Sequence, residues 1–332
     1  MSALNPSPLS AESLAALAGL LDRPVVGIDV GCRDGVRPAW RELRPHALLV
    51  GFDADPAECA RLNALAGDPA QERYEPVALA AGEGEATLYV TADPQSSSLY
   101  PPDPRALGRY PELWRHEPRG TETIRTTTLD AWAEGAGVSA IDALKVDVQG
   151  AELDVLRGAQ RNLESVRVVE SEVEFQELYE GQPLFTDVDR FLREHGFSLW
   201  RLREIHHCGL SPAGRAEPVF GVGDYVERTR LGGQIAWANA VFVREEMTDP
   251  AAKVGWETRA RDAALASIFG FPELVEFGLT QAWAGAPEPA RSALSAILEN
   301  ARRRGSLRRV DDLFRRAPAH ARGFAQAHRP GR

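Results

Sequence analysis

The chain of 332 residues is 44% hydrophobic and 26% charged, which is typical of a folded protein with one large domain or two smaller ones. Its formal net charge of -10 argues against a nucleic-acid-binding protein, and no apolar run approaches the roughly 18 residues that a membrane span needs. The three cysteines, Cys32, Cys59 and Cys208, form no CxxC pair, so they indicate reduced thiols in a cytoplasmic protein rather than disulfides or a zinc site.

Residues 1–23 predict a short N-terminal helix that begins near Ser10. The segment has no basic stretch before its apolar residues, and Glu12, Asp22 and Arg23 flank those residues. A signal peptide would begin with basic residues. We therefore expect an amphipathic helix here.

Strand and helix patterns alternate over residues 24–246, the main predicted domain. The expected strands are Val25–Val30, Ala47–Phe52, Tyr74–Ala80, Gly82–Ala92, Ile141–Val148, Val166–Phe175, Phe197–Ile205 and Ile235–Val243. The expected helices are Val36–Leu43, Pro56–Ala66, one that starts at Thr128, Ala151–Leu163 and Val188–His195. This alternation predicts an α/β fold with a mostly parallel, doubly wound sheet. The last two strands have no helix between them, which suggests an antiparallel strand at one edge.

Two segments depart from this alternation. Residues 93–123 are rich in proline and aromatic residues, and so long a connection inside a domain is usually a lid or a substrate-binding loop. Residues 247–332 lack strand patterns and predict a helical C-terminal extension with a basic tail. The tail is either a solvated helical face or a surface that docks on an acidic body of the same or another chain.

The first strand ends in a turn that suits a nucleotide-like cofactor. Asp29, Gly31 and Gly35 follow the apolar run, but Arg33 occupies the place of the glycine that a dinucleotide fingerprint requires. A carboxylate beside the turn would repel phosphate and attract a sulfonium. The spacing therefore favours S-adenosylmethionine over NAD.

The second strand ends in an acidic residue, Asp53, 24 positions after Asp29. An acid at the carboxyl end of this strand can accept hydrogen bonds from both hydroxyls of a ribose. The alternative is that Asp53 and Asp55 only begin a turn and cap the next helix.

A lysine and an aspartate share one face of a buried strand, at Lys145 and Asp147. Gly150 makes the following turn, and Ala151 begins a helix. The carboxyl end of a central parallel strand is where such folds bind and react. The alternative is an internal ion pair.

These segments resemble the FkbM-type methyltransferases over about residues 24–245. The most specific stretch is "IDALKVDVQGAELDVLRGA"; "IDVGCRDG", "GFDADP", "SSSL", "TTLDAW", "EVEFQELYEGQPLFTDVDRFLREHGFSLWRL" and "GGQIAWANAVFVR" extend the likeness. The resemblance implies a Rossmann-like class I methyltransferase fold, S-adenosylmethionine as cofactor, and O-methylation of a sugar, a glycan or a secondary metabolite.

The resemblance also assigns roles to single residues. It implies that Asp29, Gly31 and Gly35 shape the methionine side of the cofactor pocket, and that Asp53 holds the ribose. Ala78 and Leu79 would lie against the adenine, and Asp147 would stand between cofactor and acceptor. Arg33, where an Asn is common, and Asn239, where relatives often have Asp, depart from the family pattern.

The acceptor hydroxyl must lose a proton, and the sequence offers several bases. His206 and His207 follow the sixth strand of the core; a histidine suits proton transfer near neutral pH, although each is as readily a packing residue. Glu170, Glu172 and Glu174 share a strand face, and because three like charges cannot all be buried, some should lie beyond the sheet edge.

Metal binding is a less favoured use of the same residues. Asp147 and Glu172 could together hold Mg²⁺, but a plain carboxylate base is simpler. The predicted catalytic residues are therefore Asp147, Glu172 and His206. His116, near Trp114 and Tyr110, would suit either a sugar face or the packing of a lid.

The predicted function is S-adenosylmethionine-dependent O-methylation in the cytoplasm. The partner is a small-molecule or glycan acceptor; no nucleic acid is expected, and the C-terminal extension is a candidate for homo-oligomer formation. Two alternatives stay open from the residues alone: an NAD-linked sugar oxidoreductase and a non-catalytic cofactor-binding scaffold.

Overall fold

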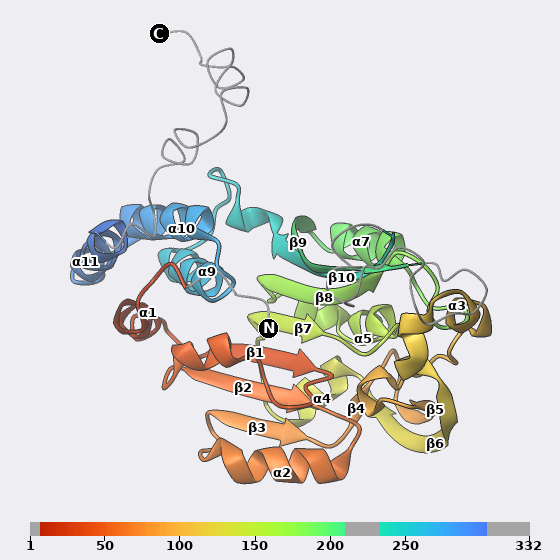
Figure 1. Ribbon diagram of the computed structural model, residues 1–332. Coiled ribbons are helices and arrows are strands. Elements are labelled where there is room, and N and C mark those ends of the chain that lie inside the picture. The colour runs from red at the N-terminus through yellow and green to blue at the C-terminus, as the bar shows by residue number, and fades with distance from the viewer. Residues whose placement is uncertain (1–6, 210–232, 304–332) are drawn as a thin grey trace, which may run out of the picture. The chain divides into compact units, whose positions relative to one another are not determined.

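A fully buried strand, β1 (Val25–Val30), lies inside a seven-stranded sheet in the computed structural model, which describes residues 7–209 and 233–303 (Figure 1). A parallel strand that is covered on both faces needs a continuous apolar run, and "VVGIDV" provides one that only Asp29 interrupts. From one edge to the other the strands are β3 (Glu72–Glu75), β2 (Ala47–Phe52), β1, β7 (Ala143–Val146), β8 (Val168–Glu174), β10 (Gln234–Arg244) and β9 (Phe197–Cys208).

The predicted α/β fold with a mostly parallel seven-stranded sheet is confirmed. Neighbouring strands from β3 to β8 are parallel, whereas β10 runs antiparallel to both β8 and β9. The antiparallel strand therefore lies one place inside the edge rather than at it. The reason is burial: β10 presents buried residues along most of its length, and β9, which is largely half-exposed, takes the edge.

Helices connect the strands and cover the sheet. They are α2 (Pro56–Ala66), α4 (Leu129–Gly135), α5 (Glu152–Arg157), α6 (Gln160–Leu163) and α7 (Phe185–Glu194), with 3₁₀ helices η1 (Pro38–Leu43) and η5 (Glu245–Met247). Their apolar faces meet the sheet in one core that includes Ile28, Val50, Leu144 and Val169. The order of the strands reverses between β1 and β7, so a crevice forms beyond the carboxyl ends of these two strands.

A second, three-stranded sheet follows the order β4 (Ala78–Leu79), β6 (Pro118–Thr127), β5 (Gly84–Thr91). Two predictions were wrong here. The expected strand Tyr74–Ala80 is divided between the two sheets at Pro76, which has no N–H to donate. The expected irregular segment 93–123 ends in β6, whose polar sequence "PRGTETIRTT" is mostly exposed and therefore lacks an apolar strand pattern.

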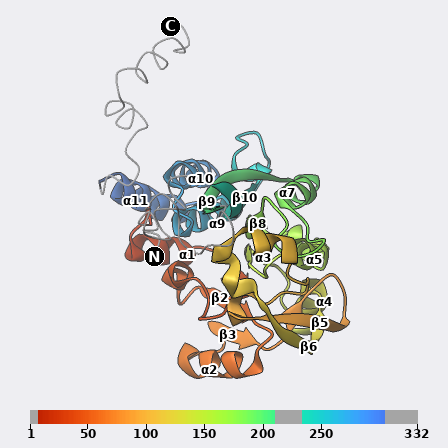
Figure 2. The same ribbon diagram turned by 45° about the vertical axis from the view of Figure 1, so that its right-hand side comes forward.

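The rest of that segment carries η2 (Pro94–Ser96), α3 (Pro104–Arg109) and η3 (Pro111–His116). Both views show α3 and the small sheet at the same end of the strands of the large sheet (Figures 1 and 2). The segment is thus folded, and it belongs to the same compact unit as the large sheet.

The second compact unit is helical. Its described residues are 7–22 and 253–303, with α1 (Ala11–Ala18), α9 (Trp256–Ile268), α10 (Pro272–Gly285) and α11 (Ala290–Arg303). The predicted start of α1 is confirmed, because the Ser10 side chain accepts a hydrogen bond from the N–H of Ser13. Most of the predicted basic tail lies outside the described residues. Among the described helices none combines the length and apolar character needed to cross a membrane.

Gly51 is a sensitive packing position in β2. A Cβ at Gly51 would lie 2.5 Å from the Cys32 sulfur and 2.6 Å from the Tyr74 ring. We expect Gly51→Ala to lower the free energy of unfolding by about 1–3 kcal/mol, the usual cost of overpacking. Urea unfolding is the measurement, with Gly120→Ala as control, since nothing lies within 4 Å of a Cβ there. Equal stability of the two variants would contradict this account.

Candidate functional site

A cavity of about 1010 Å³ lies where the carboxyl ends of β1, β2 and β7 meet. Its far wall comes from the small sheet and the segment after β5. Every residue predicted above for catalysis or cofactor binding lines it: Asp29, Gly31, Gly35, Asp53, Ala78, Leu79, Asp147, Glu172 and His206. The tertiary structure thus brings these residues together.

The turn after β1 needs glycine for a reason that the sequence does not reveal. Gly31 has a φ of +76°, and a Cβ there would overlap the backbone carbonyl oxygen of Asp147. The close approach is therefore between two turns of the protein. It sets the floor of the cavity by holding the ends of β1 and β7 together.

A buried ammonium joins the same two turns. Lys145 Nζ lies 3.2 Å from Asp29 Oδ1 and 3.3 Å from Asp147 Oδ2. The other oxygen of Asp29 accepts a hydrogen bond from the N–H of Arg37. Burial alone would lower the pKa of Lys145, but the two carboxylates outweigh it and raise that pKa. The ion pair considered as an alternative for Asp147 is thus present, and it also includes Asp29.

One carboxylate oxygen of Asp53 accepts a hydrogen bond within a turn, and the other can accept hydrogen bonds from a ligand. Its Oδ1 accepts a hydrogen bond from the N–H of Asp55 at 2.8 Å, and no described residue donates to its Oδ2. Burial raises the pKa of Asp53. The capping role belongs to Asp55, which accepts from the N–H groups of Ala57 and Glu58 and pairs with Arg33. Asp53 therefore has spare hydrogen-bonding capacity in the cavity.

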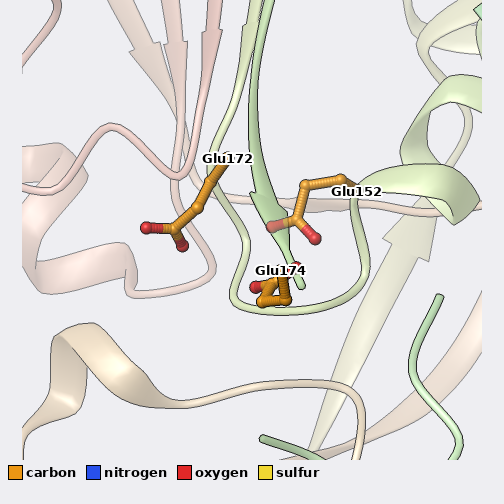
Figure 3. Close-up of side chains that lie close together, drawn as sticks. All are labelled: Glu152, Glu172 and Glu174. Carbon is orange, nitrogen blue, oxygen red and sulfur yellow. The ribbon is translucent and has the colours of Figure 1, made fainter. Parts of the chain in front are cut away.

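Three glutamates converge near the carboxyl end of β8 (Figure 3). Glu152 begins α5, Glu172 and Glu174 come from the end of β8, and one oxygen of each lies within 4.8 Å of the others. Burial raises the pKa of Glu152 to about 7 and holds those of Glu172 and Glu174 well above their ordinary values, with neighbouring carboxylates adding to the effect. Burial also acts to raise the pKa of Asp147, but Lys145 together with hydrogen bonds from Glu172 and Gln149 lowers it.

The expectation that part of the glutamate row on β8 lies outside the sheet was wrong. Glu170 is 0% exposed and Glu174 2%, and Glu172 is half-buried. Glu170 can be buried because Arg37 donates a hydrogen bond to it. The sequence does not show this partner, since Arg37 lies 133 positions away.

Sequence analysis missed Gln149, which connects the acidic residues. Its Nε2 donates to Asp147 Oδ1 at 3.2 Å and to Glu172 Oε2 at 2.5 Å, and its Oε1 accepts from the Tyr179 hydroxyl. Its φ of +58° is unusual for a residue with a side chain. Its only sequence signal is the position directly before Gly150.

The aromatic wall of the cavity contains His206 and Trp237, whose rings stack at 4.8 Å. Burial lowers the pKa of His206. Asn239 is not among the lining residues, and its side chain donates to Glu204. His116 also lines the cavity, is 7% exposed, and has no hydrogen-bond partner at Nδ1.

The chain was compared with known proteins. The profile of the methyltransferase FkbM domain matches residues 29–199, about half of the chain. The 2-O-methyltransferase NoeI of Sinorhizobium fredii is 32% identical over 173 residues, which are 50% of this chain and 70% of that protein.

Solved structures are more distant. TrmK of M. capricolum, in complex with S-adenosylhomocysteine, is 7% identical, with a TM-score of 0.33 and coverage of 89% of this chain and 97% of that one. A Burkholderia thailandensis 1,6-didemethyltoxoflavin-N1-methyltransferase is 11% identical, with a TM-score of 0.30 and coverage of 71% of this chain and 79% of that one. Scores this low add nothing to the fold assignment, which rests on the strand order.

The burial of His116 predicts a pH-dependent stability. Burial lowers the pKa of His116 to about 4, against 6.5 for a free histidine, and only Asp93 and a hydrogen bond to the Leu113 backbone oppose this. The unfolded chain therefore binds the proton more readily, and stability is lost as the pH falls from 6.5 towards 4. Relative to His116→Gln, the wild type should lose about 2–3 kcal/mol of unfolding free energy between pH 7.5 and 4.5. Parallel urea-unfolding profiles of the two proteins would contradict this.

Proposed function

The chain belongs to the FkbM methyltransferase family, and from that premise we propose that it methylates a hydroxyl group of a sugar, a glycan or a secondary metabolite with S-adenosylmethionine as donor. The observation that carries the proposal is one cavity lined by the predicted cofactor residues and by a group of acidic side chains. The name of the relative NoeI, a 2-O-methyltransferase, supports oxygen as the methylated atom. No observation favours the NAD-linked oxidoreductase or the non-catalytic scaffold.

The described residues fit the proposed cofactor. Asp53 Oδ2 is free to accept hydrogen bonds from ribose hydroxyls, and Ala78 and Leu79 offer an apolar surface for the adenine. Gly31 and Gly35, both at positive φ, shape the turn that borders the region proposed for the methionine end. S-adenosylmethionine, when bound, supplies a methyl group on a positively charged sulfur.

The chain's own residues must orient the acceptor and take its proton. We assign to Asp147 the role of accepting the hydroxyl proton. Its carboxylate is 30% exposed, and its lowered pKa keeps it ionised at neutral pH. Glu172 and His206 would hold the acceptor from two sides. The stacked rings of His206 and Trp237 offer a flat surface of the kind that packs against a sugar face.

Three further proposals concern the whole protein. A cytoplasmic location is supported by the lack of a disulfide within the described part of the chain. The net charge of -10 supports an acceptor other than nucleic acid. Homo-oligomer formation through the helical unit stays a prediction from the sequence.

The direct test of the function is methyl transfer from labelled S-adenosylmethionine to a panel of mono- and oligosaccharides. We expect label to appear in an alkali-stable ether and S-adenosylhomocysteine to form in equal amount. Hydride transfer from NADH without any methylated product would overturn the proposal.

Asp53→Ala should weaken the binding of S-adenosylhomocysteine by about 1–3 kcal/mol, because ribose hydroxyls would lose a charged partner. Titration calorimetry measures this. Asp68→Ala is the control: this exposed aspartate also holds a turn, through the N–H of Ala70, but lies outside the cavity lining. Unchanged affinity in Asp53→Ala would remove the ribose assignment.

Asp147→Asn should lower turnover by about 100-fold or more, the usual scale of acid–base catalysis. The melting temperature should change little, because Lys145 keeps its ion pair with Asp29. Single-turnover rates and thermal melts on one preparation measure both effects. The control is Asp154→Asn on α5, which lies outside the cavity lining. A large loss of stability with normal turnover per folded molecule would leave Asp147 a purely structural role.

A further inference from the structure

Three carboxyl groups lie together at the edge of the cavity with no matching cation among the described residues. The carboxylates of Glu152, Glu172 and Glu174 lie within 4.8 Å of one another, at the start of α5 and the end of β8 (Figure 3). The ligand atoms of this group are all carboxylate oxygens. Like charges this close repel strongly in a buried setting.

The burial of Glu174 without an ionic partner is a second observation, independent of the distances between the three carboxylates. Glu174 is 2% exposed, lines the cavity, and receives no hydrogen bond from any other described residue. Several other buried carboxylates are paired with a cation: Glu170 with Arg37, Glu72 with Arg41 and Arg44, Asp142 with Arg23, and Asp29 with Lys145. Glu174 has no such partner among the described residues, so its carboxylate is available to a ligand.

We propose that Glu152, Glu172 and Glu174 bind a divalent cation that prefers oxygen ligands, of the Mg²⁺ or Mn²⁺ type. Three carboxylates suit these hard cations, whereas a zinc site would favour histidine or cysteine. Oxygens bound to one Mg²⁺ lie at most about 4.2 Å apart, twice the metal–oxygen distance. A small shift of the side chains would therefore bring these three oxygens, now within 4.8 Å of one another, onto one ion. Backbone N–H groups of Val148 and Gly150 already orient the Glu152 carboxylate.

The cation would lie beside the residues that we propose to bind the acceptor molecule. This part of the inference rests on the proposed function. Gln149 joins Glu172 to Asp147, so the cation and the proposed proton acceptor are two side chains apart. A divalent cation lowers the pKa of a hydroxyl group that it binds. The hydroxyl proton would pass to Asp147, and the oxygen would be free to attack the methyl group. Two neighbouring hydroxyls of a sugar are suitable ligands for the remaining positions.

Binding of Mn²⁺ alone is the experiment. The full-length protein is stripped with EDTA and titrated with Mn²⁺, and free Mn²⁺ is followed by electron paramagnetic resonance, without donor or acceptor. We expect one site, which Glu174→Gln and Glu172→Gln each weaken at least tenfold. Glu122→Gln is the matched control, since this exposed carboxylate lines the same cavity from the small sheet, and it should bind Mn²⁺ as the wild type does.

Thermal melts separate a lost ligand from a lost fold. Mn²⁺ should raise the melting temperature of the wild type and leave that of Glu174→Gln unchanged. Without metal, Glu174→Gln should be at least as stable as the wild type, because it removes a repelling charge. Absence of Mn²⁺ binding at millimolar concentration, or equal binding by all the variants, would overturn the inference and indicate that protons alone neutralise the group.

The two proposals can fail separately. Methyl transfer at an unchanged rate in EDTA, with no Mn²⁺ bound, would leave the methyltransferase intact and overturn the cation site. Mn²⁺ binding that depends on Glu174, without transfer to any acceptor, would support the site and overturn the assigned reaction.

Discussion

The buried ammonium of Lys145 is the interaction on which the site depends. It stands between Asp29 at the end of β1 and Asp147 just after β7, and so it joins the two strands where the order of the sheet reverses. Removing the ammonium would leave the buried Asp29 carboxylate without its cation. Such a loss typically costs about 3–5 kcal/mol, roughly a third or more of a domain's stability. The Asp147 carbonyl can approach Gly31 so closely because glycine has no Cβ.

Charge divides the cavity into two halves. On the side of β1 and β2, Lys145 neutralises Asp29, and Asp53 keeps one free oxygen, an arrangement that suits a cofactor with hydroxyl groups. On the side of β8, no described residue supplies a cationic partner to Glu172 or Glu174, and burial raises the pKa values of both. Asp147 belongs to both halves. A residue in this position can link a donor on one side to an acceptor on the other.

The far wall of the cavity comes from segments that are tied to the turn after β7. The Ser98 hydroxyl donates to the backbone carbonyl of Gln149, and the Tyr179 hydroxyl donates to that of Ser96. Gln95 reaches Asp34 in the turn after β1. These contacts give the segment after β5 a defined path over the cavity. They also connect the acceptor side to the turn that carries Asp147.

The sequence alone determined the buried strands such as Val25–Val30, the acidic residues that follow them, and the family motif around Asp147. These features are local, because they depend only on the spacing of apolar residues and on the residues of each turn. The sequence could not locate β6, whose exposed strand has no apolar pattern. It also could not pair Glu170 with Arg37 or Lys145 with Asp29, since these contacts span 133 and 116 residues. Only the tertiary structure decided which acids are neutralised and which stay unpaired, because burial and charge pairing depend on residues far apart in the chain.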